Sequence, residues 1–386
     1  MNNIYLDTAS TTKPNQEVVD VIVEYLNNKW HNPSSLYSNA TKVKENLNSA
    51  KKTVADFISA NADEIYFTSS GSESNCWALQ GFVNYTRNHT DKVPVIITSK
   101  IEHHSIMACL DELKYDAHVF YIDVNKDGVV NIKQLDDYLH KFDLDSYSVL
   151  VSIMHANNEI GSIQDIELIS KIVHGHNGAI LHCDCTQSFG HIPIDVNYLG
   201  IDMMTASGHK ISAPKGTAIL YKRNGININP LIFGSQMNGL RGGTENTAYI
   251  MGFAKAVELS KKRVQDSNRI ELVRDYFINK LTDAGCKLNG PVDNRLPSNI
   301  NVMLPKEVGG EEMLLLLDMS GICIGVGSAC NSMMKKPSYV LKAIGLTDEE
   351  CARSIRITFS EDISNEDIDK VVKEIENSIK ILRQAN

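Results

Sequence analysis

The sequence predicts an α/β fold with a mainly parallel sheet, followed by a smaller α+β unit. Short β-rich runs alternate with helical patterns between about residues 60 and 223, as in consecutive βαβ units. After Pro291 this alternation gives way to short strand runs and one closing helix. We therefore predict a large domain at 14–255 and a small C-terminal domain at 256–386, which also includes residues 1–13.

Each element is predicted from its own pattern, because strands buried on both faces form continuous apolar runs and surface helices show a 3.6-residue period. Strands of the large domain are predicted at residues 64–69, 93–99, 117–123, 148–155, 179–185, 203–207 and 216–223. Helices are predicted at residues 40–60, 131–142, 166–176, 246–266 and 270–285. The small domain is predicted to hold strands at 298–304, 322–328 and 354–360 and a helix at 365–384.

The composition excludes several classes of function. Of the 386 residues, 42% are hydrophobic and 22% are charged, which is typical of a globular protein. The net charge of −9, without a basic run, argues against direct binding of nucleic acid. No apolar stretch is long enough for a membrane span, and no secretory signal is apparent. The scattered cysteines are expected to be reduced thiols. The sequence therefore predicts a cytoplasmic enzyme.

Polar residues directly after strands are candidates for a site, because ligands of open α/β sheets bind beyond the carboxyl ends of the strands. Gly71 and Ser72 open a helix, whose N-terminus favours an anion such as phosphate. His103 is either an aromatic wall for a flat ligand or a structural histidine. A zinc site with His104 is disfavoured, because adjacent loop residues rarely chelate one ion and no His or Cys partner has i, i+4 spacing. No metal site is predicted.

Two further strand ends carry Asp184 and Lys210. A carboxylate at the end of an apolar strand is costly unless a cation or donors satisfy it, and Gln187 lies one turn further on. Cys183 and Cys185 suggest metal or redox chemistry, but no second cysteine pair complements them. Lys210 also follows an apolar run, and a lysine in a dry site can form a Schiff base with a carbonyl.

These residue types together fit one cofactor, pyridoxal 5'-phosphate. The cofactor needs a lysine for its aldehyde and a carboxylate that keeps its pyridine nitrogen protonated. It also needs donors for its phosphate and a neighbour for its flat ring. The sequence therefore predicts a pyridoxal phosphate site at the carboxyl ends of the sheet.

An ordered series of motifs resembles the cysteine desulfurases of the NifS/IscS type, in the class V aminotransferase family. The resemblance covers nearly the whole length and implies the aspartate aminotransferase-like fold type I of pyridoxal phosphate-dependent transferases. Its motifs are "LDTASTT" (6–12), "NPSS" (32–35), "TSSGSESN" (68–75), "EHHS" (102–105), "HANNEIGSIQDI" (155–166), "CDCTQSFG" (183–190), "SGHKISAPKG" (207–216), "GLRGGTEN" (239–246), "GSACNS" (327–332), "PSYVLKAIG" (337–345) and "SIRITFS" (354–360).

The resemblance implies a role for each matching residue around the ring. Lys210 would bind the cofactor covalently, and His103 would stack on its ring. Asp184 would pair with the ring nitrogen, and Gln187 would reach the phenolic oxygen. Cys330, in "GSAC", would be the nucleophile, so that the implied catalytic residues are Lys210, His103 and Cys330.

The resemblance also implies a phosphate site and a substrate site. Gly71, Ser72, Ser207 and His209 would surround the phosphate. Thr244 would reach the phosphate of a neighbouring subunit, which implies a homodimer. Arg356 would bind the substrate carboxylate, a task that suits a bidentate guanidinium, and Asn157 would position the substrate. All these positions carry the matching residue type except Ser72, where the family usually has threonine.

The implied reaction converts L-cysteine to L-alanine and leaves the sulfur on Cys330 as a persulfide. An acceptor protein, such as an iron–sulfur scaffold or a tRNA thiolation enzyme, would then receive the sulfur. A selenocysteine lyase, another C–S lyase or an aminotransferase on the same fold is the alternative, but only persulfide chemistry needs a protein thiol. A catalytically silent binding partner is disfavoured, because the key positions are intact. Departures from the family pattern occur at Tyr37, Met237, Asn238, Val326 and Glu361.

Overall fold

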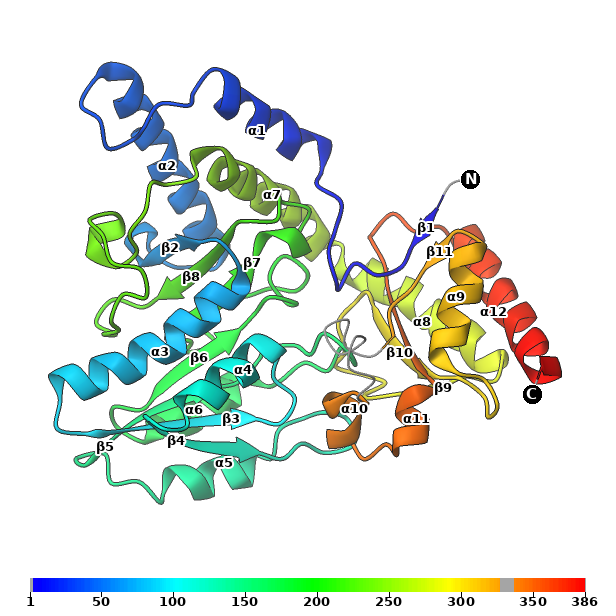
Figure 1. Cartoon of the computed structure of the whole chain (residues 1–386). Coiled ribbons are helices and arrows are strands. Elements are labelled where there is room, and N and C mark those ends of the chain that lie inside the picture. The colour runs from blue at the N-terminus through cyan, green and yellow to red at the C-terminus, as the bar shows by residue number, and fades with distance from the viewer. Residues whose placement is uncertain (1–2, 327–336, 386) are drawn as a thin grey trace.

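The computed structural model describes residues 3–326 and 337–385, which form a larger and a smaller lobe side by side (Figure 1). The larger lobe is built on a seven-stranded sheet with the order β2-β8-β7-β6-β5-β3-β4. Its strands are parallel except for β8, which runs antiparallel to both β2 and β7. The strands are β2 (Ile65–Thr68), β3 (Val93–Ser99), β4 (His118–Ile122), β5 (Tyr147–Ser152), β6 (Ile180–Asp184), β7 (Met203–Ser207) and β8 (Ala218–Lys222).

Helices cover this sheet and explain its continuous apolar strands. Every residue of β7 and β8 is buried, as is typical of strands that are covered on both faces. Phe253 of α7 contacts the ring of Phe67, which lies in β2, and the ring of Phe189, which follows β6. The helices of this lobe are α1 (Gln16–Asn27), α2 (Ser38–Phe57), α3 (Gly71–His89), α4 (His104–Leu113), α5 (Ile132–Leu139), α6 (Ile166–Gly175) and α7 (Thr247–Gln265).

The smaller lobe contains a three-stranded antiparallel sheet with the order β12-β10-β9. The N-terminal strand β1 pairs in parallel with β11, so the first residues of the chain lie in this lobe (Figure 1). Its strands are β1 (Ile4–Tyr5), β9 (Lys287–Leu288), β10 (Asn299–Met303), β11 (Ile322–Cys323) and β12 (Ser354–Thr358). Its helices are α8 (Ser267–Asp283), α9 (Gly310–Met319), α10 (Tyr339–Ala343), α11 (Asp348–Ala352) and α12 (Asn365–Ala385).

The predicted fold class, a mainly parallel α/β sheet with a smaller α+β unit, is confirmed. Each lobe has its own hydrophobic cluster, and a third cluster joins α10 and α11 to loops of the large sheet. The predicted boundary at residues 255/256 falls inside α7, whose side chains as far as Val257 pack in the larger cluster. That boundary stays a prediction. Within the described ranges, no helix combines the length and the apolar character that crossing a membrane requires.

The sequence pattern did not predict α1, α4, α9, α10 or α11. Helices α10 and α11 have five residues each, which is too short for a helical period to show. Helix α9 carries an unbroken apolar run at its centre, so period alone could not distinguish it from a strand.

Candidate active site

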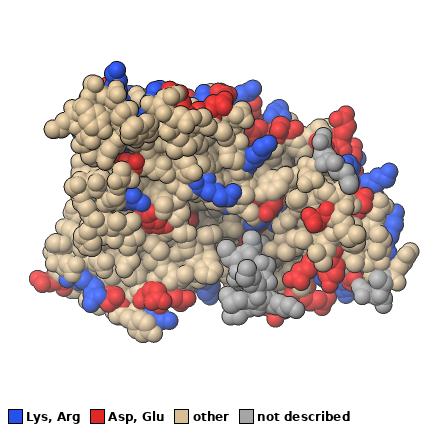
Figure 2. Space-filling view, turned by 45° about the horizontal axis from the view of Figure 1, so that its top comes forward, with Lys and Arg blue, Asp and Glu red and all other residues tan. Residues whose placement is uncertain are grey.

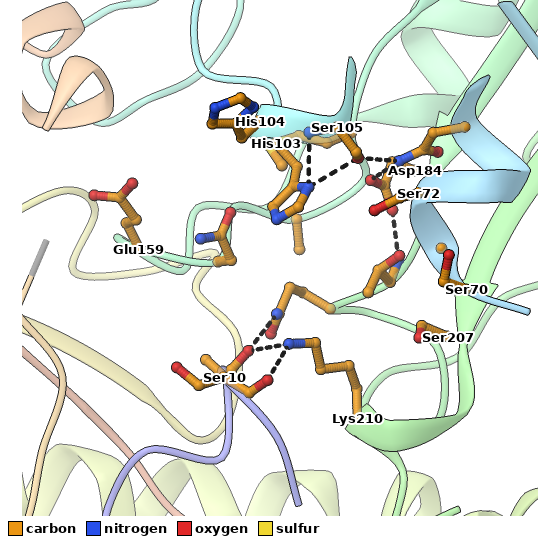
Figure 3. Close-up of a pocket in the computed structure, with 18 of the residues that line it drawn as sticks. Ser10, Ser70, Ser72, His103, His104, Ser105, Glu159, Asp184, Ser207 and Lys210 are labelled. Carbon is orange, nitrogen blue, oxygen red and sulfur yellow. Dashed lines mark hydrogen bonds between the residues drawn. The ribbon is translucent and has the colours of Figure 1, made fainter. Parts of the chain in front are cut away.

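A cavity of about 290 Å³ opens between the two lobes at the carboxyl ends of the parallel strands. Figure 2 shows the surface hollowed between the lobes, and Figure 3 shows side chains from several loops pointing into the cavity. Most of the predicted site residues meet here. The predicted residues that line the cavity are Gly71, Ser72, His103, Asp184, Gln187, Ser207, His209, Lys210 and Arg356.

Asp184 ends β6 and directs its carboxylate into the cavity, although only 4% of the residue is exposed. The flanking Cys183 and Cys185 point the other way into the core, as strand alternation predicts. Asn75 donates from Nδ2 to Oδ2 of Asp184 at 2.7 Å, and the Thr186 amide donates to Oδ1 at 2.9 Å. These two donors fix the orientation of the carboxylate and leave it capacity for a ligand cation. Sequence reasoning missed Asn75.

His103 caps α4 at its N-terminus and lies across the cavity from Lys210 (Figure 3). Its Nδ1 accepts the amide N–H of Ser105 at 3.2 Å, and the same nitrogen lies 2.8 Å from the Ser105 hydroxyl. Burial lowers the pKa of His103, and Lys210 and His104 lower it further against the opposing effect of Asp184. His103 is therefore a neutral ring at pH 7, which suits stacking on an electron-poor aromatic ligand.

Lys210 ends a short 3₁₀ helix (Gly208–Lys210) directly after β7. Its Nζ donates to the carbonyl oxygens of Ala9 at 2.5 Å and Ser10 at 2.7 Å, so the N-terminal segment holds the amine at the cavity (Figure 3). Gln187 donates from Nε2 to the same Ala9 carbonyl at 3.1 Å. Carbonyl dipoles thus hold the amine of Lys210 at the edge of the cavity.

The N-terminus of α3 forms the end of the cavity where an anion would bind. Ser70 caps this helix, and its hydroxyl accepts the amide N–H of Glu73 at 3.2 Å. Within the described part of the chain, the amides of Gly71 and Ser72 have no hydrogen-bond acceptor. Free amides at a helix N-terminus attract anions, because the helix dipole adds to their donors.

The surroundings of Gly71 fit a phosphate group. A Cβ at Gly71 would lie 3.3 Å from Oγ1 of Thr186 and 3.5 Å from Cβ of Ser207, so a side chain here would occupy the cradle. Oγ1 of Thr186 is buried and has no partner among the described residues. Burial lowers the pKa of His209 to about 4, so its ring is a neutral donor at pH 7. The cradle therefore offers amides, hydroxyls and an imidazole to an anion.

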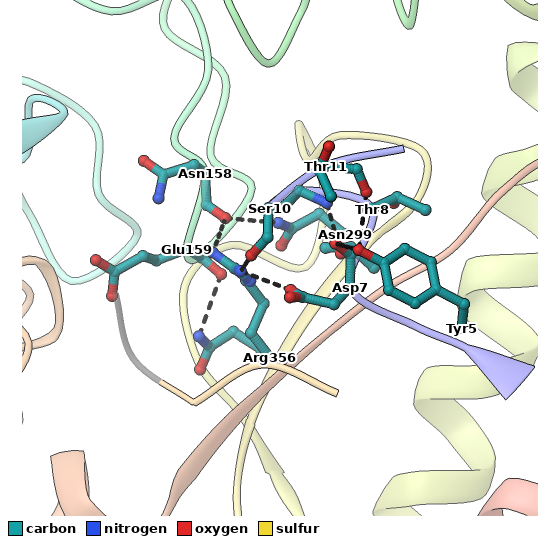
Figure 4. Close-up of polar contacts among 12 residues, drawn as sticks. Tyr5, Asp7, Thr8, Ser10, Thr11, Asn158, Glu159, Asn299 and Arg356 are labelled. Carbon is teal, nitrogen blue, oxygen red and sulfur yellow. Dashed lines mark hydrogen bonds and ion pairs between the residues drawn. The ribbon is translucent and has the colours of Figure 1, made fainter. Parts of the chain in front are cut away.

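Arg356 lies in β12 of the smaller lobe, is 3% exposed and faces the cavity. Its Nη2 forms an ion pair with Oδ1 of Asp7 at 2.7 Å and donates to Oγ of Ser10 at 2.8 Å, as Figure 4 shows. Its Nη1 donates to the carbonyl of Asn158 at 3.2 Å. Nε has no partner in the described structure, and a Cβ at Gly325 would lie 3.1 Å from it. The guanidinium is thus fixed in place with donor capacity to spare.

Three predicted site residues do not join this cavity in the described structure. Asn157 is buried in the turn after β5, where Nδ2 donates to the Ile101 carbonyl and Oδ1 accepts the Glu159 amide. Thr244 is exposed and does not line the cavity of its own chain. Cys330 lies outside the described residues. The roles of these three residues stay predictions.

Two buried glutamates near the cavity were missed. Glu159 is 1% exposed and lines the cavity, where it accepts a hydrogen bond from Ser338 at 2.6 Å, and burial raises its pKa. Glu102 is fully buried and accepts from Ser99 at 2.5 Å and from the Met154 amide at 3.0 Å. Both occur in quoted motifs, but no local pattern in the sequence indicates that either carboxylate is buried.

Glu102 is expected to make stability depend on pH. Burial raises its pKa from 4.5 to about 8, so the folded state binds the proton more tightly than the unfolded state does. The free energy of unfolding should therefore decrease as pH rises from about 4.5 to about 8. Urea unfolding of Glu102→Gln across this range should show a smaller decrease. Glu112→Gln, which changes an exposed carboxylate of α4, is the control, and equal pH slopes in both variants would contradict the prediction.

The positions that depart from the family pattern lie outside the cavity. Met237 and Asn238 have positive φ angles of 48° and 59°, so this turn uses a left-handed conformation without glycine at either position. Glu361 forms an ion pair with Arg263, with Nε to Oε2 at 2.9 Å. Tyr37 is half-exposed on the larger lobe. None of these contacts touches the residues that line the cavity.

The fold and the arrangement of Lys210, Asp184 and the anion cradle define a class of protein, which comparison with known proteins identifies. Residues 4–371 match the aminotransferase class-V family, and the chain belongs to this family. Within it, the chain belongs to the cysteine desulfurases. A cysteine desulfurase IscS from Methanosarcina thermophila is 39% identical, over 99% of this chain and 93% of the relative. One from Dictyoglomus turgidum is 40% identical, over 98% and 95%.

Solved structures agree with this assignment. A NifS-like protein has a TM-score of 0.90 and 30% identity, over 98% of this chain and 100% of its own. The structure of SspA in complex with cysteine has a TM-score of 0.78 and 31% identity, over 92% and 98%. The resemblance that the motifs indicated is therefore confirmed.

Proposed function

We propose that this desulfurase binds pyridoxal 5'-phosphate at Lys210, converts L-cysteine to L-alanine and keeps the sulfur on Cys330 as a persulfide. The observation that carries the proposal is the meeting of Lys210, Asp184 and His103 in one cavity with an anion cradle at its end. A structurally similar protein, SspA, was solved in complex with cysteine, which supports L-cysteine as the substrate.

The residues of the cavity fit the cofactor group by group. The phosphate would lie in the cradle at Gly71 and Ser72, and Asp184 would hold a proton on the pyridine nitrogen. The neutral ring of His103 would cover one face of the cofactor. When bound, pyridoxal phosphate supplies an aldehyde for amines and an electron-poor ring that stabilises negative charge at the substrate α-carbon.

The side chains of the protein would perform the remaining steps. The guanidinium of Arg356 would bind the substrate carboxylate through its unused donor capacity, which fixes the α-carbon near Lys210. Nζ of Lys210 would remove the α-proton and later return a proton. Asp184 would keep its orientation throughout, because its carboxylate accepts hydrogen bonds from Asn75 and Thr186.

The sulfur step would take place at Cys330. Its thiolate attacks the substrate sulfur, an S–S bond forms and the C–S bond of the substrate breaks. The electron pair of the broken bond passes to the carbon skeleton, which leaves as alanine after protonation. The protein then carries Cys330–S–SH, and a thiol of an acceptor protein can attack its outer sulfur. An iron–sulfur scaffold or a tRNA thiolation enzyme is the proposed acceptor.

A second copy of the chain is the proposed structural partner. Large apolar side chains are exposed at Leu26, Trp30, Leu36 and Phe233, with Trp30 65% exposed. Such surface favours burial against another chain. Thr244 is exposed on its own chain and would reach the phosphate site of the partner. Light scattering should give a mass of twice 42.8 kDa, and a mass of one chain would contradict this part of the proposal.

Alanine and sulfide release from L-cysteine under a dithiol reductant tests the proposed reaction. The native protein should form both products in equal amounts, and Cys330→Ala should lose about 10³-fold or more in rate, because the nucleophile is gone. Cys76→Ala, which changes a partly buried thiol outside the cavity, is the control. If Cys330→Ala keeps its cofactor absorbance and still releases both products at the native rate, the persulfide mechanism is wrong.

A further inference from the structure

Three potential metal ligands meet on the surface of the larger lobe, away from the cavity. Asp136 lies on α5, His140 directly follows that helix, and His176 directly follows α6. Helices α5 and α6 contact each other. One ligand atom from each of the three residues lies within 4.8 Å of the others. No other group of three or more His, Cys, Asp or Glu among the described residues meets this criterion.

The distances in this cluster match those of a transition-metal site. Nδ1 of His140 lies 3.3 Å from Oδ1 of Asp136, and Nε2 of His176 lies 3.7 Å from the same oxygen. Zinc binds imidazole nitrogen and carboxylate oxygen at about 2.0–2.2 Å, so two tetrahedral ligands lie about 3.4 Å apart. Only small side-chain movements are therefore needed to place all three ligands around one ion.

The helix ends provide a second, independent reason for a cation here. His140 is the C-cap residue of α5, and His176 is the C-cap residue of α6. The C-terminal ends of both helices therefore lie next to the cluster, and a helix C-terminus carries a partial negative charge. The carboxylate of Asp136 adds a full negative charge between the two imidazoles. Two helix ends and one carboxylate favour a divalent cation at this place.

We propose that Asp136, His140 and His176 form a binding site for a divalent transition-metal ion such as Zn²⁺. Two imidazoles and one carboxylate favour zinc, nickel or copper over magnesium and calcium, which prefer oxygen ligands. Three protein ligands leave a position for water, so the ion exchanges with solvent. The bound ion links the C-terminal ends of α5 and α6 and stabilises the edge of the larger lobe, where α5 contacts β4.

The tertiary structure creates this site, and the sequence pattern did not predict it. Asp136 and His140 have i, i+4 spacing, but the sequence criterion of paired histidines and cysteines does not include a carboxylate. The third ligand, His176, comes from the next helix, 36 positions after His140 in the printed sequence. Nδ1 of His140 lies 2.9 Å from the Asp136 carbonyl. Metal binding exchanges this hydrogen bond for a coordinate bond.

Titration of the cofactor-loaded enzyme, after treatment with a chelator, tests the site. Calorimetry with Zn²⁺ should show a site that His140→Asn and His176→Asn each weaken about tenfold or more. Asp137→Asn, which removes an exposed carboxylate of the same helix outside the cluster, should bind like the native protein. Co²⁺ should give a spectrum of nitrogen and oxygen ligands at this site, which distinguishes it from binding to cysteine thiols.

Melting temperatures complete the test. Zn²⁺ should raise the melting temperature of the native protein and of Asp137→Asn, because binding to the folded state alone stabilises it. It should not raise that of the two histidine variants. Circular dichroism and cofactor absorbance show whether each variant folds. The proposal is overturned if folded His140→Asn and His176→Asn bind zinc as tightly as the native enzyme, or if cobalt reports only thiolate ligands.

Discussion

Lys210→Ala is expected to abolish covalent attachment of the cofactor and to slow turnover of L-cysteine by about 10²–10⁴-fold or more. The loss follows from the position of Nζ, which the carbonyls of Ala9 and Ser10 hold at the cavity beside Gln187. General base catalysis alone contributes a factor of this size, and alanine provides neither a base nor an amine. Borohydride reduction followed by mass spectrometry measures the attachment separately from the turnover.

Lys215→Ala is the matched control for this prediction, because Lys215 is exposed five residues further on and does not line the cavity. It should keep both the reducible cofactor bond and the native rate. If Lys210→Ala still gave a cofactor adduct on a cavity peptide, another amine would hold the cofactor. If it kept the adduct and the rate, the proposed role of Lys210 would be wrong.

Arg356→Lys is expected to raise the KM for L-cysteine about 10- to 100-fold with a smaller effect on kcat. A charge-assisted hydrogen bond is worth about 1.5–3 kcal/mol, and each 1.4 kcal/mol corresponds to a factor of ten. Lysine keeps the positive charge but lacks the planar fork, and Asp7 and Ser10 already engage Nη2 of the arginine. Steady-state kinetics with L-cysteine measures the effect.

Arg269→Lys provides the comparison, because Arg269 is an exposed arginine that donates to the backbone carbonyl of Glu361, outside the cavity. It should leave KM unchanged. Cofactor absorbance and melting temperature should stay near native in both variants, since the change at Arg356 preserves the charge beside Asp7. An unchanged KM in a folded, cofactor-loaded Arg356→Lys would show that the substrate carboxylate binds elsewhere.

Much of the candidate site could be predicted, because its residues occur at recognisable ends of strands. Asp184 comes at the end of an apolar run, and strand alternation predicts that its flanking cysteines face the core. The structure has this arrangement. Lys210 follows another such run. The partners of these residues could not be predicted in the same way: Asn75 is 109 positions from Asp184, and no local pattern connects them.

The same limit explains what was missed around the substrate. The ion pair of Arg356 with Asp7 spans 349 positions and depends on the pairing of β1 with β11 in the smaller lobe. Glu102 and Glu159 lie in quoted motifs, but their burial depends on α10 and α11, which are too short to show a period. A carboxylate in a loop motif gives no sign of burial until the covering helices are placed.

The sequence by itself determined the order and type of the main elements, because apolar period and turn residues act over a few positions. It also determined which reactive and binding groups lie at strand ends, since Lys210, Asp184 and the cradle residues Gly71 and Ser72 each occur at or after the end of a strand. The tertiary structure decided which of these side chains meet. The N-terminal segment at Lys210 and the cluster of Asp136, His140 and His176 arise from topology, which brings distant positions together through contacts that no short stretch encodes.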